Sequence, residues 1–397
     1  MAGAALDYSR ANSARTAMQA AVDSAALMLS KDAQTLSTTA LNQKGTAYFT
    51  ALLTRADLTN ITVATTYTVP QQGSFKLTLA VAAQVPMTLM KVFNIDHVAL
   101  SANTEVVWGM KKLEVALALD NTGSMAQSSK LTNLKTAAHN LLTTLQNAAK
   151  VDGDVKVAII PFTTGVNVGT LYNANNWFDY DTIDCNGSLS GTGCAANNWK
   201  NYWTGCIRDR TYPYDTQDDV PNTATAATLY PAFPSSGTND CGSLQQLMPL
   251  TYDWTALNNK ITAMTAAGNT NVTVGMVWAW HALTAQAPMS EAAAPAPDLD
   301  KVIILLTDGD NTASWKNSNN SDVTSSSAID VRTALACTNA KAAAIEIYTV
   351  RVINGNASLL QGCATTPSMY FDVSAASQLD SVFSSIAQNL ANLRISK

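Results

Sequence analysis

The stretch Leu113–Met125, LEVALALDNTGSM, decides the fold of this chain. Its apolar run VALAL ends abruptly at Asp120. An uninterrupted apolar run is typical of a strand that is buried on both faces, as in a parallel sheet. The carboxylate of Asp120 and the hydroxyls of Thr122 and Ser124 follow at alternate positions at the strand end. These hard oxygen donors suit Mg²⁺, Mn²⁺ or Ca²⁺ rather than zinc or copper.

A second apolar run ends in the same way. Residues 301–307, KVIILLT, lead directly into Asp308-Gly309-Asp310-Asn311. Because the C-terminal ends of parallel strands meet at one edge of a sheet, the two polar groups predict a single site at that edge.

From Lys111 onward, strand and helix patterns alternate. Strands are predicted at 113–119, 155–162, 301–307, 345–350 and 369–373. Helical periodicity covers 130–148, 254–266, 271–285, 328–344 and 375–393. This alternation predicts an α/β fold, a doubly wound parallel sheet with helices on both faces. Residues of about 165–246 lack periodicity and read as an irregular, disulfide-stapled insertion. Since the insertion follows the strand that ends at Phe162, we expect it to border or cover the metal site.

The first part of the chain has a different pattern. Residues 1–58 read as helical, with Met18, Val22, Ala25 and Leu29 on one face. Strands at 61–69, 75–85 and 98–108 follow, with a turn at 71–73. A long helix and antiparallel strands make a small α+β unit. We therefore place domains at 1–110 and 111–397, because 397 residues exceed one ordinary core.

Composition restricts the class of protein. Hydrophobic residues make up 47% of the chain and charged residues 13%, a composition typical of a globular protein. The net charge is -5, and the sequence contains no basic block. Nucleic acid is therefore not an expected partner. No apolar run reaches the ~18 residues that span a bilayer. The opening MAGAALDYSR reads as the membrane-exit end of a helix, which predicts an anchoring segment upstream of Gly3; the alternative is a free amphipathic helix.

Six cysteines favour disulfides and an oxidising, extracytoplasmic compartment. A zinc site is disfavoured, because there is no CxxC and there are only three histidines. Cys337 and Cys363 flank a predicted strand and can pair. The four insertion cysteines permit three pairings, of which sequence separation favours Cys185–Cys194 with Cys206–Cys241.

The spacing of the oxygen donors resembles a known family. D-x-T-x-S at one strand end, Thr270 in the later loop GNTN, and Asp308 at a second strand end resemble the von Willebrand factor A domain, from Lys111 to about Leu393. The resemblance implies a metal-ion-dependent adhesion site. In it the hydroxyls of Ser124, Thr122 and Thr270 would bind the metal, with Asp120 and Asp308 binding directly or through water.

Several expectations follow from this resemblance. The family usually has serine where this chain has Thr122, but threonine keeps the donor oxygen. The bound Mg²⁺ would leave one position open for an acidic side chain of a protein partner. Asp310 and Asn311 could orient the metal ligands through hydrogen bonds, without binding the metal themselves. The D-x-T-G-S motif alone is also ordinary turn and helix-cap chemistry, so a vestigial metal site is an alternative.

The N-terminal region resembles a second family. The helix pattern beginning LDYSR, with the later stretch VPMTLMKVFNIDHVALSA, resembles TadG-like pilus-assembly proteins of the tight-adherence (Tad/Flp) system over residues 1–108. That resemblance implies a pilin-like region joined to an A domain. It implies action in the bacterial cell envelope (periplasmic, anchored in the inner membrane, or on the surface) with pilus components as partners. The alternative is an adhesin that binds host or surface ligands directly.

An enzymatic role is not predicted. His97, His139 and His281 are scattered, and no nucleophile with a neighbouring base is visible. Neither metal motif supplies a histidine or glutamate that could act as a base. Trp278 and Trp280 read as core anchors.

Overall fold

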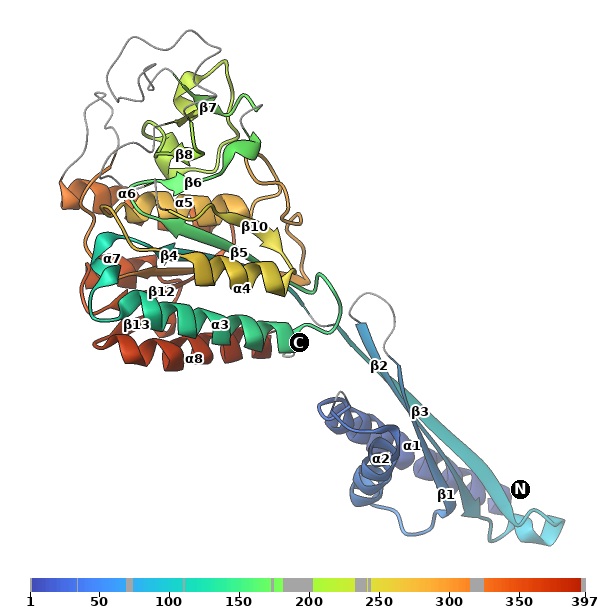
Figure 1. The fold of residues 1–397 in the computed structure, drawn as a ribbon. Coiled ribbons are helices and arrows are strands. Elements are labelled where there is room, and N and C mark those ends of the chain that lie inside the picture. Colours follow the sequence, from blue (N-terminus) through green and yellow to red (C-terminus); the bar gives the residue numbers. More distant parts are fainter. Residues whose placement is uncertain are drawn as a thin grey trace. The chain divides into compact units, whose positions relative to one another are not determined.

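The computed structural model (Figure 1) describes residues 2–33, 35–68, 74–109, 111–172, 175–180, 203–232, 241, 244–314 and 325–393. The chain divides into two compact units, and the second begins at Lys111. Among the described residues, no helix combines the length and the apolar character that crossing a bilayer would require.

The first unit packs two helices against a three-stranded antiparallel sheet. Its elements are α1 (Ala2–Ser30), α2 (Thr38–Leu52), β1 (Thr59–Thr68), β2 (Ser74–Pro86), the 3-10 turn η1 (Met90–Phe93) and β3 (His97–Gly109), in sheet order β1-β2-β3. The expected face of α1 is buried, with Met18, Val22 and Leu29 fully covered. The three predicted strands are confirmed, whereas the predicted turn at 71–73 lies outside the described residues.

The prediction of unbroken helix to residue 58 was wrong. The helix ends at Ser30, and α2 starts afresh after Ser37, whose hydroxyl accepts a hydrogen bond from the backbone N–H of Ala40. Serine is a favoured N-cap because its side chain satisfies a backbone donor in the first turn. The connecting segment 31–37 contains neither proline nor glycine, so no strong helix breaker marks the end of the first helix in the sequence.

The second unit is built on a six-stranded sheet of order β10-β5-β4-β11-β12-β13. The strands are β4 (Lys112–Asp120), β5 (Val155–Phe162), β10 (Met248–Thr251), β11 (Leu299–Thr307), β12 (Glu346–Val352) and β13 (Tyr370–Val373). Neighbours are parallel except β10, which pairs antiparallel with β5. This edge strand was not predicted; it is short and directly follows the insertion.

Helices cover both faces of this sheet, which confirms the doubly wound fold. α3 (Lys130–Ala148), α4 (Trp254–Ala263) and α8 (Leu379–Leu393) share one core with Val115 and Leu117 of β4. α5 (Val272–Ala282), α6 (Ser326–Ala342) and α7 (Ala357–Cys363) share the other core with Ala116 and Ala118. Alternate residues of β4 thus face opposite helix layers, as a fully buried strand requires.

The insertion is only partly described. It contains short strands at β6 (Val166–Asn167), β7 (Phe178–Asp179), β8 (Cys206–Ile207) and β9 (Tyr230–Pro231). Buried Trp203, Ile207 and Tyr230 join the core beside α5, which contains the buried Trp278 and Trp280. The expected core role of these two tryptophans is confirmed.

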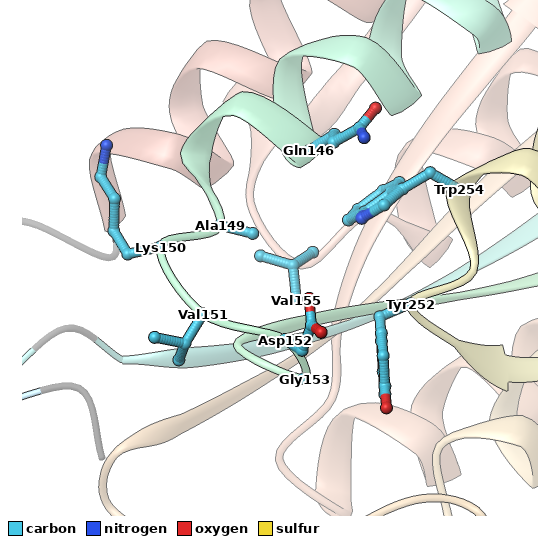
Figure 2. A pocket seen from close by; sticks show the side chains of 9 residues that line it. All are labelled: Gln146, Ala149, Lys150, Val151, Asp152, Gly153, Val155, Tyr252 and Trp254. Atoms are coloured by element: carbon cyan, nitrogen blue, oxygen red, sulfur yellow. The ribbon is translucent and has the colours of Figure 1, made fainter. Parts of the chain in front are cut away.

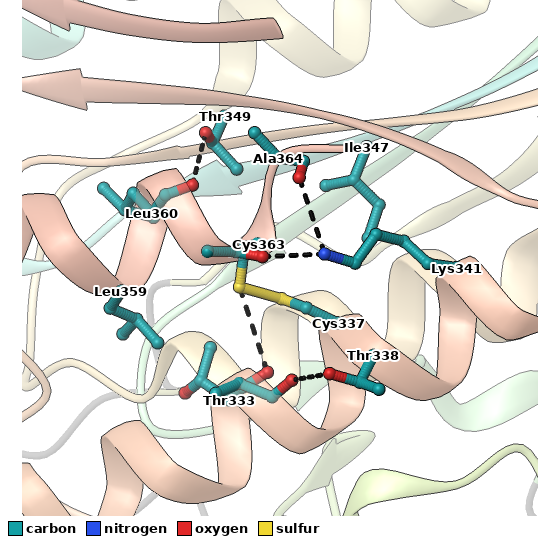
Figure 3. The surroundings of a disulfide bond; sticks show 12 residues. Thr333, Cys337, Thr338, Lys341, Ile347, Thr349, Leu359, Leu360, Cys363 and Ala364 are labelled. Carbon is teal, nitrogen blue, oxygen red and sulfur yellow. Dashed lines mark hydrogen bonds between the residues drawn. A yellow bond between two sulfur atoms is a disulfide. The ribbon is translucent and has the colours of Figure 1, made fainter. Parts of the chain in front are cut away.

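Disulfides occur in both predicted places. Cys206 and Cys241 are bonded within the insertion, and Cys337 and Cys363 join α6 to α7. Figure 3 shows the second bond, beside which Thr349 of β12 donates a hydrogen bond to the carbonyl of Leu360 at 2.8 Å. Cys185 and Cys194 lie outside the described residues.

Candidate metal centre

Two neighbouring parallel strands bring the two aspartates together. Asp120 ends β4, and Asp308 directly follows β11. These strands are paired in register, with Leu119 beside Leu306, so both carboxylates lie at the same sheet edge. The two apolar runs of the sequence therefore place their polar ends side by side.

Hydrogen bonds connect the carboxylates to the predicted hydroxyls. The backbone N–H of Thr122 donates to Oδ1 of Asp120 at 2.8 Å. Ser124 Oγ donates to Oδ1 of Asp308 at 2.6 Å and lies 3.0 Å from Thr122 Oγ1. The motif residues thus form one connected cluster of oxygen atoms that includes the second aspartate.

The loop before α5 supplies the third hydroxyl. The backbone N–H of Gly123 donates to the carbonyl of Gly268 at 2.9 Å, which holds this loop against the motif. A Cβ atom placed on Gly309 would lie 3.8 Å from both Ser124 Oγ and Thr270 Oγ1. The structure therefore brings all five residues of the predicted set to one place: Asp120, Thr122, Ser124, Thr270 and Asp308.

The centre is buried and short of positive charge. Asp120 and Asp308 are 0% and 1% exposed. Burial, followed by the neighbouring carboxylate of Asp308, raises the pKa of Asp120 to about 6. Thr307 stabilises the charged form in part, because its hydroxyl donates to Oδ2 of Asp120 at 2.6 Å. A pair of buried carboxylates of this kind favours a bound cation.

Lys130, which the sequence reasoning missed, supplies one positive charge. Its Nζ lies 2.7 Å from Oδ2 of Asp308, and the side chain is 5% exposed. It is the first residue of α3, and Ser128 and Ser129 before it both have positive φ, at 51° and 54°. Non-glycine residues adopt this left-handed conformation only at an energetic cost. At these two serines the conformation turns the chain from the motif into the helix.

The two predicted supporting residues differ in their surroundings. Asn311 is buried; its Oδ1 accepts from the N–H of Val272 and its Nδ2 donates to Asp330, both at 2.7 Å. It therefore fixes the start of α5, next to Thr270. Asp310 is exposed and makes no hydrogen bond or ion pair with the part of the chain that the structure describes. The expectation that Asp310 orients a ligand finds no contact to support it.

A further supporting position is Gly355, which the sequence reasoning also missed. Its φ is +103°, and a Cβ there would lie 2.9 Å from the carbonyl oxygen of Gly309. Only glycine fits such a close approach in this conformation. The loop after β12 thus packs against the backbone that carries Asp308.

The insertion is tied to the same loop. Ser314 Oγ donates to Asp209 Oδ2 at 2.5 Å, and Arg332 of α6 lies 3.1 Å from Asp215. Burial raises the pKa of Asp215 to about 7, although Arg332 opposes the shift. β5 runs parallel to β4, so the insertion leaves the sheet at the edge that carries Asp120. The insertion therefore borders the segment that follows Asp308.

The donor set fits a hard divalent ion. Among the described residues, no three His, Cys, Asp or Glu side chains converge, so hydroxyls would have to provide most protein ligands. Two carboxylates and three hydroxyls match the preference of Mg²⁺, which also retains waters. Zinc prefers nitrogen and sulfur ligands, which this centre lacks in its described surroundings.

Comparison with solved structures gives matches of low sequence identity and with TM-scores below 0.5. The von Willebrand factor domain of the pilus tip protein Mfa5 from Porphyromonas gingivalis has 12% identity and a TM-score of 0.44, covering 73% of this chain and 98% of that one. The pilus adhesin SpaC from Lactobacillus rhamnosus GG has 14% identity and a TM-score of 0.42, covering 84% and 34%. The chain thus spans about a third of SpaC.

The family comparison concerns the start of the chain. No curated protein sequence matches this chain. Residues 1–28 match the family model described as putative Flp pilus-assembly TadE/G-like. Residues 2–28 of this match lie in α1, and the match agrees with the resemblance of the N-terminal region. The similarity to the TadE/G-like Flp pilus-assembly family is thus a similarity of the first helix.

Proposed function

We propose that this chain is a non-enzymatic pilus-assembly and adherence protein of the cell envelope. In this proposal the A domain holds Mg²⁺, or Mn²⁺ or Ca²⁺, at Asp120, Thr122, Ser124, Thr270 and Asp308. The ion then binds an acidic side chain of a protein partner. The family match at residues 1–28 supports a role in the pilus system, and the two described disulfides suit an extracytoplasmic compartment.

The charge of the buried centre carries the metal proposal. Asp120 and Asp308 contribute two negative charges at neutral pH, and Lys130 contributes one positive charge. One negative charge is left uncompensated in a buried place, which is costly. A divalent ion would reverse the sign to a single positive charge. One carboxylate from a partner would then neutralise the centre, which is why an acidic ligand is the fitting one.

Each residue of the chain has a distinct task in this proposal. The hydroxyls of Thr122, Ser124 and Thr270 are neutral donors, so they coordinate an ion without cancelling its charge. Lys130 holds Asp308 in place through its 2.7 Å ion pair. When bound, the ion supplies an electrophilic position for a carboxylate oxygen.

Removing a single hydroxyl tests the proposal in cells. Thr270→Val keeps the shape of the side chain and deletes one donor, and Thr136→Val on the exposed side of α3 is the matched control. We expect cells with Thr270→Val to assemble few pili and to adhere poorly, while the control behaves as wild type. Normal pili with lost adherence would favour the direct adhesin instead. Normal pili and normal adherence would refute the metal-dependent role.

A further inference from the structure

A pocket of about 190 Å³ lies far from the metal centre, within the second unit (Figure 2). It is formed by the end of α3, the loop 149–154, the start of β5 and the segment between β10 and α4. β4 pairs with Val155 at the pocket end and with Phe162 at the metal end. At about 3.3 Å per residue, the two places are roughly 23 Å apart along the strands. The pocket is therefore spatially separate from the metal centre.

An aromatic wall is the first notable feature of this pocket. Trp254 begins α4 and is half-buried, with its inner side against the apolar core. The helix start is fixed by Asp253, whose side chain accepts from the N–H of Ala256 at 2.9 Å. Figure 2 shows the indole of Trp254 above Val155, with Tyr252 forming a second wall. Rigid aromatic rings offer a large apolar contact area at a low entropic cost.

Unused polar groups are the second feature. Within the part of the chain that the structure describes, no hydrogen bond is made by the side chains of Gln146, Asp152, Tyr252 or Trp254, all of which line the pocket. The indole N–H and the phenol of Tyr252 can donate, the carboxylate of Asp152 accepts, and the amide of Gln146 does both. The pocket therefore offers donors and acceptors around an aromatic face.

We propose that this pocket binds a neutral hexopyranose, either free or as the end of a saccharide. The C–H face of a sugar ring packs flat on an indole, and its hydroxyls both donate and accept hydrogen bonds, as these side chains require. The volume suits about one sugar ring. A site of this kind would give the protein a glycan contact that is separate from metal-dependent binding of a protein.

A cationic side chain is the main rival ligand, because aromatic walls with a carboxylate also suit an ammonium or guanidinium group. A cation only donates hydrogen bonds, however, so it can pair with Asp152 and with the phenol oxygen of Tyr252 but gives the indole N–H of Trp254 no acceptor. Lys150 also lines the pocket, and its positive charge opposes a second cation. The hydroxyl-rich neutral ligand satisfies more of these groups.

Saturation-transfer NMR on the full chain tests the proposal, with glucose, galactose, mannose and N-acetylglucosamine as probes. The pocket variants are Tyr252→Ala and Asp152→Asn, and the control is Tyr212→Ala, because Tyr252 and Tyr212 are both 47% exposed. Thermal unfolding first establishes that each variant is folded. We expect at least one hexose to bind, with at least tenfold weaker binding in both pocket variants and no change in the control.

Chelation by EDTA should leave the sugar signal unchanged, so failure of the metal proposal and failure of this one are distinguishable. The proposal is overturned if none of the sugars gives a signal, or if the signal survives in both pocket variants. It is also overturned if lysine or arginine amides bind instead and lose binding in Asp152→Asn.

Discussion

Replacing Lys130 with methionine tests the charge balance of the metal centre. The change keeps most of the apolar stem of the side chain and removes the ammonium group that lies 2.7 Å from Asp308. Both side chains are at most 5% exposed, so water can replace the lost partner only in part. Removing one member of a buried ion pair typically costs about 3–5 kcal/mol, because the other charge stays buried and unpaired.

We therefore expect the metal-free Lys130→Met variant to be about 3–5 kcal/mol less stable than wild type. For a unit of this size, that loss corresponds to a decrease in Tm of roughly 10 °C. Excess Mg²⁺ should restore more stability in the variant than in wild type, because a divalent ion compensates both carboxylates. The control Lys135→Met on the same helix loses only one exposed hydrogen bond, to the carbonyl of Thr262, and should cost about 1 kcal/mol or less.

Urea unfolding followed by tryptophan fluorescence is the suitable assay, in EDTA and in excess MgCl₂. All tryptophans except Trp108 belong to the second unit, so the signal reports mainly on that unit. If Lys130→Met lost less than about 1 kcal/mol of unfolding free energy in EDTA, the reasoning would be refuted, because the buried ion pair would then contribute little to stability. If Mg²⁺ stabilised both proteins equally, Lys130 would have no part in the charge balance of the metal centre.

Two further predictions concern packing and pH. Gly275→Ala should lower the free energy of unfolding by about 1–3 kcal/mol, because its Cβ would lie 2.4 Å from the buried ring of Phe162. Gly362→Ala, whose Cβ would have nothing within 4 Å, should raise it by about 0.5–1 kcal/mol. Thermal unfolding of both variants shows whether the two effects have opposite signs. The pKa of Asp215 is raised to about 7, so its contribution to stability is complete below pH 4 and is lost as the pH rises through 7. Between pH 4 and pH 8 the free energy of unfolding of wild type should therefore fall by up to about 4 kcal/mol more than that of Asp215→Asn. Parallel curves of unfolding free energy against pH for the two proteins would contradict this.

The strand ends of the metal centre were predictable, because an apolar run indicates a buried strand. The first polar residue after the run then marks the edge of the sheet. Asp120 and Asp308 were found in this way. Thr270 was identified only through the family resemblance, because its place depends on how the loop before α5 folds back. Lys130 escaped notice because the direction of a long flexible side chain is set by tertiary structure. Thr307 was counted only as the end of an apolar strand.

Longer-range features escaped prediction for related reasons. The break between α1 and α2 has no proline or glycine to mark it, and Ser37, the N-cap of α2, is one of many small polar residues in this region. The antiparallel direction of β10 depends on the path of the insertion before it, which has no periodicity to read. The aromatic pocket joins Gln146 to Trp254 across a long sequence separation, and no local pattern indicates that they meet.

Calorimetric titration with Mn²⁺ and Mg²⁺ tests the metal centre most directly, in wild type, Asp120→Ala, Thr270→Val and the control Thr136→Val. We predict one bound ion per chain for wild type and the control. Asp120→Ala should abolish binding, and Thr270→Val should weaken it at least tenfold because one of the five predicted ligands is lost. No heat of binding in wild type, or the same affinity in wild type and Asp120→Ala, would contradict the assignment of this centre.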